Sequence, residues 1–122
     1  MKETSLINYS EEEKNLEWIC DGYYFLLPKS INKLLEVDKK LQISANQARM
    51  DLILEKQILS MYVEKDGNCK LLILLTKNEE GIFVLNSLCS HQKSCPSSEE
   101  RIVLGKWCVE KHIVFSFSLK NE

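Results

Sequence analysis

The stretch that decides the fold spans residues 69–95 and reads CKLLILLTKNEEGIFVLNSLCSHQKSC. Residues 71–75 are apolar without interruption. A strand in which apolar and polar residues do not alternate must be covered on both faces. A polar connector containing Gly81 leads to a second apolar run, 82–85, as in a β-hairpin. We therefore predict two neighbouring strands at the centre of a sheet, with the flanking segments covering them.

The flanking segments predict two further hairpins and two helices. The pairs Asp21-Gly22 and Asp66-Gly67 are typical of tight turns between strands. Ser30 is placed to cap a helix over 31–41. A capping box at 44–47 predicts a second helix to about residue 57, or as far as Met61. Beyond the central hairpin we expect strands at 102–109 and at 112–119, where apolar residues alternate.

Together these elements predict a single domain over residues 1–122 of the α+β class. Its sheet is expected to be mostly antiparallel, with an N-terminal hairpin followed by a C-terminal meander of about five strands. Both helices are expected to pack on one face of that sheet.

Composition excludes several classes of function. Sixteen basic and 18 acidic residues leave a net charge of -2, which lacks the positive excess of a nucleic-acid-binding protein. No apolar run reaches the roughly 18 residues of a membrane span, and the first residues do not form a signal peptide. We expect a cytoplasmic or nuclear protein whose five cysteines are reduced, since they are odd in number and irregularly spaced.

The loop after the central hairpin gathers potential metal ligands. Cys89, His91 and Cys95 could supply three of the four ligands of a tetrahedral zinc site, with Cys108 or His112 as the fourth. Their spacing is not one of the common zinc pairs, and free cysteine is a frequent core residue. We expect no cofactor, and zinc is the alternative.

The same residues carry a resemblance to Rieske iron–sulfur domains. Cys89-Ser90-His91 and the later segment 108–112, CVEKH, resemble the two cluster-binding boxes of that family. The resemblance implies two thiolates on one iron and two imidazoles on the other, with Cys95 similar to an extra cysteine near the cluster. The second box is one residue too long, and Pro and Gly do not frame it. The iron–sulfur alternative therefore ranks below zinc.

Function is predicted from apolar surface in excess of what one sheet can cover. The second predicted helix carries an additional apolar face formed by Met50, Leu54, Ile58 and Met61. The predicted edge strand 112–119 is a second surface that could receive a partner or a second copy. We expect a non-enzymatic interaction module, a small intracellular adaptor or complex subunit. No recognised catalytic motif surrounds any cysteine or histidine, so an enzyme is not expected.

Overall fold

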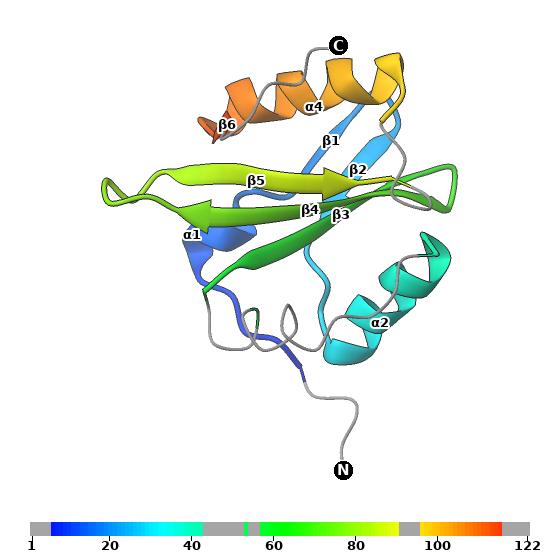
Figure 1. Ribbon diagram of the computed structural model, residues 1–122, viewed down its shortest axis with the longest axis horizontal. Coiled ribbons are helices and arrows are strands. Elements are labelled where there is room, and N and C mark those ends of the chain that lie inside the picture. The colour runs from blue at the N-terminus through cyan, green and yellow to red at the C-terminus, as the bar shows by residue number, and fades with distance from the viewer. Residues whose placement is uncertain (1–5, 43–52, 54–56, 91–95, 116–122) are drawn as a thin grey trace.

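A computed structural model of the chain describes residues 6–42, 53, 57–90 and 96–115. In these residues six strands form one sheet in chain order, and three helices accompany it (Figure 1). The strands are β1 (Trp18–Cys20), β2 (Tyr23–Leu26), β3 (Leu59–Lys65), β4 (Asn68–Lys77), β5 (Phe83–Cys89) and β6 (Val114–Phe115). The helices are α1 (Glu11–Lys14), α2 (Ile31–Lys40) and α4 (Ser98–Lys111). The α+β class and the mostly antiparallel sheet are thereby confirmed.

All three predicted hairpins are present. The sheet is antiparallel from β1 to β5, and β4 lies between β3 and β5 as the uninterrupted apolar run required. At the first and second turns, Asp21-Gly22 and Asp66-Gly67 adopt positive φ, at 54°, 82°, 55° and 78° in chain order. These are the conformations that favour Asp-Gly in two-residue hairpin turns.

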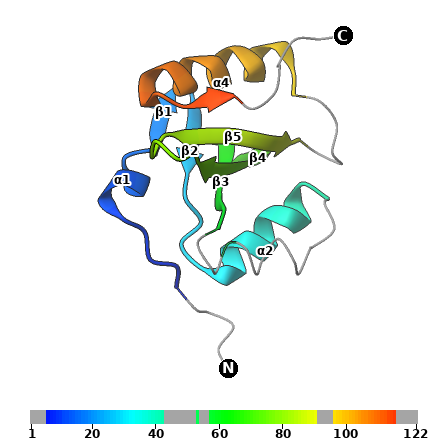
Figure 2. The same ribbon diagram turned by 60° about the vertical axis from the view of Figure 1, so that its left-hand side comes forward.

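The two longer helices cover opposite faces of the sheet, as Figures 1 and 2 show. Strand β3 explains how: Met61 and Val63 belong to the apolar cluster that includes α4, whereas Tyr62 belongs to the cluster that includes α2. Successive strand residues point to opposite faces, so an uninterrupted apolar strand feeds two cores. The prediction that the helices over 31–41 and 44–57 pack on one face is not confirmed, because most of the second lies outside the described residues; the helix on the other face, α4, was not predicted.

The prediction of α2 is confirmed, and its serine cap is present. The Ser30 side chain accepts a hydrogen bond from the Lys33 backbone N–H at 3.2 Å. Most of the second predicted helix, 44–57, lies outside the described residues, as do Met50 and Leu54. Its extension to Met61 is wrong, because Met61 belongs to β3, pairs with Ile73 and is fully buried.

The strand predicted at 102–109 is also wrong, because these residues belong to α4. The β-branched residues in this segment favour a strand, but Val103, Leu104, Trp107 and Cys108 are buried with helical spacing. The chain therefore returns to the sheet through a helix. As a result β6 pairs with β5 in parallel, and not as the last strand of an antiparallel meander.

Candidate functional site

Helix α4 carries the candidate site, and its start is fixed by a capping box. The Ser97 hydroxyl accepts a hydrogen bond from the Glu100 backbone N–H at 3.1 Å. The Glu100 carboxylate in turn accepts one from the Ser97 backbone N–H at 2.9 Å. Two N–H groups that lack partners within the helix are satisfied in this way, so the first turn is held in place.

The inner side of α4 is anchored in the core through Trp107. Its side chain is fully buried and stacks on Phe25 of β2 with ring centroids 4.8 Å apart. The indole N–H donates to the Leu16 backbone carbonyl at 2.8 Å. Since this contact fixes both the depth and the rotation of the helix, it determines which residues of α4 face outward.

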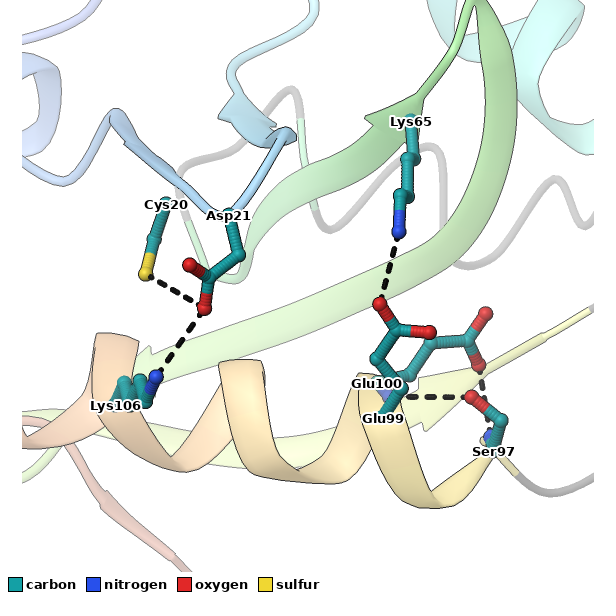
Figure 3. Close-up of polar contacts among 7 residues, drawn as sticks. All are labelled: Cys20, Asp21, Lys65, Ser97, Glu99, Glu100 and Lys106. Atoms are coloured by element: carbon teal, nitrogen blue, oxygen red, sulfur yellow. Dashed lines mark hydrogen bonds and ion pairs between the residues drawn. The ribbon is translucent and has the colours of Figure 1, made fainter.

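Two ion pairs tie one flank of α4 to the turns of the sheet (Figure 3). Lys65 at the end of β3 lies 2.8 Å from Glu99, and Lys106 lies 3.2 Å from Asp21 in the β1–β2 turn. The hydrogen bond from Lys106 lowers the pKa of Asp21, and the same bond raises the pKa of Lys106. Glu99 and Lys106 on this flank therefore each point toward an opposite charge within the same chain.

The outer side of α4 presents apolar side chains to water. Ile102 is 61% exposed and Val109 is 78% exposed, while Leu104 and Trp107 on the inner side are fully buried. Seven residues are nearly two helical turns, so Ile102 and Val109 lie on one line, and Gly105 lies beside that line. We call Ile102, Gly105 and Val109 the outer stripe. None of the apolar clusters formed by the described residues includes a member of it.

The chain reaches the sheet edge directly after α4. His112 ends the helix in a left-handed conformation, with φ of 59°, and the Ile113 N–H donates to the Cys108 carbonyl. β6 then forms the last strand in the order of the sheet, with Val114 46% exposed and Phe115 41% exposed. The predicted strand over 112–119 is confirmed at these two residues, and 116–119 lie outside the described part of the chain.

The predicted metal ligands are only partly described. Cys89 ends β5 and packs against the cluster on the α2 side, whereas Cys108 is buried in the cluster on the α4 side. The sheet therefore separates Cys108 from Cys89, which argues against Cys108 as the fourth ligand of a site at Cys89. His91 and Cys95 lie outside the described residues.

The raised pKa values of Cys69 and Cys108 make these two thiols poorly reactive near neutral pH. Burial raises the pKa of Cys108 to about 12, and burial together with Glu64 raises the pKa of Cys69 to about 11. Within 6–42, 53, 57–90 and 96–115, no three or more His, Cys, Asp or Glu residues gather as a metal site requires. A zinc site at Cys89, His91 and Cys95 stays a prediction, which zinc analysis of protein purified without chelators would test.

Two cavities lie beside the N-terminal segment. One, of about 180 Å³, is lined by Tyr9, Glu13 and Phe83 among others, and the second, of about 400 Å³, includes Tyr9, Lys14 and Glu17. Tyr9 donates its hydroxyl proton to the Pro28 carbonyl at 2.6 Å, and burial is the main cause that raises its pKa. Neither cavity is lined by His112 or by one of the four described cysteines, so neither places a thiol beside a base.

Comparison of the sequence with protein-family models, with curated proteins and with solved structures finds no match. Among the described helices, none combines the length and the apolar character needed to cross a membrane. Function is therefore inferred from the chain's own surface.

Sequence reasoning missed the outer stripe because it assigned the segment to a strand. The signal for a helix was nevertheless present. Ser97 and Glu100 have the spacing of a capping box, and the residues buried at 103, 104, 107 and 108 follow the period of a helix. With that period, Ile102 and Val109 fall opposite the core.

Proposed function

We propose that this chain is a non-enzymatic interaction module that binds a protein partner on the outer stripe of α4. The observation that carries the proposal is the exposure of Ile102 and Val109 on a helix whose opposite side is fully buried. A helix that needed only one contact with its sheet would present polar residues there. The apolar residues on the outer side are therefore available for a second contact.

The energetics favour docking at this surface. Burying an exposed Ile or Val side chain contributes about 1.5–3 kcal/mol. Gly105 leaves a shallow position between the two, and the charged residues on the flank are already paired within the chain. A partner would therefore cover apolar surface without having to separate Lys106 from Asp21 or Lys65 from Glu99. Avoiding that desolvation leaves more of the apolar gain for binding.

The sequence predicted two other partner surfaces, and the structure buries described residues of one and exposes the other. On the predicted helix face, Met61 is buried in β3 and Ile58 is partly buried. The edge strand is retained as an extension of the site, because β6 follows α4 after two residues and both of its side chains are exposed. A partner seated on the outer stripe would meet β6 at the C-terminal end of the helix.

The proposed role is that of a small intracellular adaptor or complex subunit, in the cytoplasm or the nucleus. Four cysteines are described, and all four are free thiols. This supports a reducing compartment, since disulfides persist mainly in oxidising ones.

Affinity capture from a lysate of the native cells tests the proposal. The bait is the full chain, compared with the double variant Ile102→Lys/Val109→Lys. The matched control is Ile19→Lys, because Ile19 on β1 is as exposed as Ile102, at 61%, but points to the other face of the sheet: its strand neighbour Trp18 packs against the cluster on the α4 side. We expect the same proteins with wild type and control and their loss with the double variant. A set of captured proteins that is unchanged by the double variant would contradict the proposal.

A further inference from the structure

We propose that the smaller of the two cavities beside the N-terminal segment binds a small, neutral, apolar molecule about the size of one aromatic ring. The cavity has a volume of about 180 Å³ and lies between residues 7–13, the start of β3, the end of β4 and the start of β5. None of its lining residues belongs to α4, so this site is separate from the outer stripe and goes beyond the proposed function.

The floor of the cavity is apolar and almost closed to water. Leu75 is fully buried, and Ile53, Leu59 and Phe83 are 5%, 8% and 8% exposed. Leu59 on β3 pairs with Leu75 on β4 in the register of the sheet. Two walls of the cavity therefore belong to neighbouring strands that are hydrogen-bonded to each other.

The charged groups at the cavity already have partners within the chain. Lys77 lies 2.6 Å from Glu12, and its ammonium group is also 5.1 Å from the centre of the Phe83 ring. The Glu13 carboxylate accepts a hydrogen bond from the Ser10 backbone N–H at 2.8 Å. A charged ligand would therefore find no unpaired opposite charge among the residues that line the cavity, and it would lose its hydration on entry.

The uncharged polar groups at the cavity also favour an apolar ligand. The Thr76 hydroxyl accepts a hydrogen bond from the Asn86 side chain, and Tyr9 donates its hydroxyl proton to the Pro28 carbonyl. Gln57 is neutral and exposed, so water can solvate it at the mouth of the cavity. A neutral apolar molecule would bind without breaking any of these hydrogen bonds.

The volume sets the size of the ligand. An apolar cavity of about 150 Å³ lined by Leu, Ile and Phe side chains stays dry and binds benzene. At about 180 Å³ this cavity has room for one substituted ring, and its floor contains the same residue types. Sites for larger organic ligands have roughly 300–1,000 Å³. Toluene is therefore a suitable probe.

The larger cavity provides an internal control for the location. It has about 400 Å³, and Lys14, Glu17 and Lys29 are among its lining residues, so charges of both signs surround it. The two cavities share Ile7 and Tyr9. Residues 57–59 and 75–77 report on the smaller cavity alone, whereas residues 14–17 and 27–29 report on the larger one.

Titration of the ¹⁵N-labelled full chain with toluene, followed by ¹H–¹⁵N correlation spectra, tests the inference. We expect the backbone amides of 57–59, 75–77 and 83 to shift, with little change in 98–111, and a dissociation constant of about 1 mM. Benzoate and benzylamine carry the same ring with a negative or a positive charge. Each should bind at least about tenfold more weakly than toluene, because its charge would be desolvated without a partner.

A variant that fills the cavity should abolish binding. Ile58→Trp adds volume at the cavity wall and should weaken toluene binding by at least about tenfold. The matched control is Leu35→Trp, because Leu35 on α2 is 43% exposed and lines neither cavity. The amide spectrum shows whether each variant is folded, and the wild-type titration does not depend on either. Ile102→Lys/Val109→Lys should bind toluene as wild type does.

Absence of amide shifts up to about 5 mM toluene would overturn the inference, as would shifts confined to 14–17 and 27–29. Benzoate or benzylamine binding as tightly as toluene would also overturn it, and so would toluene binding that survives in folded Ile58→Trp. If toluene does not bind but Ile58→Trp loses captured proteins, the cavity receives a side chain of a partner and the inference is wrong. The proposed function is tested separately, by capture with the double lysine variant.

Discussion

The two sides of α4 contain similar residue types with opposite environments. Leu104 and Trp107 on the inner side are fully buried, whereas Ile102 and Val109 on the outer side are 61% and 78% exposed. The difference shows that residue type alone does not identify the core of this domain. The inner side packs in the core, whereas the outer stripe belongs to none of the apolar clusters formed by the described residues. Substitutions on the two sides should therefore have very different effects on stability.

The largest effect is expected for Trp107→Ala. The change removes a fully buried side chain stacked on Phe25 and the indole hydrogen bond to Leu16, so the free energy of unfolding should fall by about 3–5 kcal/mol. Chemical denaturation measures the loss. The matched change on the outer side, Ile102→Ala, should cost less than about 0.5 kcal/mol. Equal losses at the two positions would refute the contrast between the sides.

A smaller effect is expected from Cys108 on the inner side of α4, which should make the free energy of unfolding depend on pH. Burial raises the pKa of Cys108 from 9.0 to about 12. Below pH 9 both states hold the proton, and above it the unfolded state loses the proton first, so the free energy of unfolding falls as pH rises from about 9 toward 12. At pH 10 the earlier ionisation of this thiol in the unfolded state should lower the free energy of unfolding by about 1.4 kcal/mol.

The control for this prediction is Cys108→Ala, which removes the titrating group. The stability difference between wild type and Cys108→Ala, measured by denaturation at pH 8 and pH 10, should shrink by about 1.4 kcal/mol. A difference that stays constant with pH would mean that the thiol is not protected from ionisation in the folded protein.

On the outer side, Gly105→Ala should stabilise the monomer. An added methyl group meets open space among the described atoms, and alanine is the better helix former, so we expect a gain of about 0.5–1 kcal/mol at low protein concentration. Thermal unfolding of dilute protein measures it. A loss of stability would indicate that Gly105 packs closely within its own chain.

The smallest effect is expected at the charged flank. Asp21→Asn keeps a residue that tolerates positive φ in the turn and removes the ion pair with Lys106. Because Lys106 lowers the pKa of Asp21, the contribution of this pair is present above the unfolded carboxyl pKa and is lost as pH falls through the lower folded value. Both groups are exposed, so the change in melting temperature should be small and should vanish at high salt. A large loss that persists at high salt would contradict this interpretation.

The sequence predicted the hairpins and α2 because their signals are local. Asp-Gly turns require positive φ at adjacent residues, and Ser30 caps the helix that it precedes. The assignment of 102–109 failed because β-branched residues were given more weight than the spacing that Trp107 completes. The expectation that Cys108 lies beside Cys89 was wrong for a related reason. Spacing along the chain does not reveal that the sheet lies between Cys89 and Cys108.

By itself the sequence determined that β4 would be covered on both faces, because an unbroken apolar strand leaves no side for water. It also determined the class of the fold and the positions of three turns. Only the tertiary structure decided that the cover on one side is α4, since the buried indole of Trp107 fixes the rotation of that helix by contacts with Phe25 and Leu16, which are distant in sequence. The same rotation turned Ile102 and Val109 outward, and it therefore decided which apolar side chains of α4 are exposed.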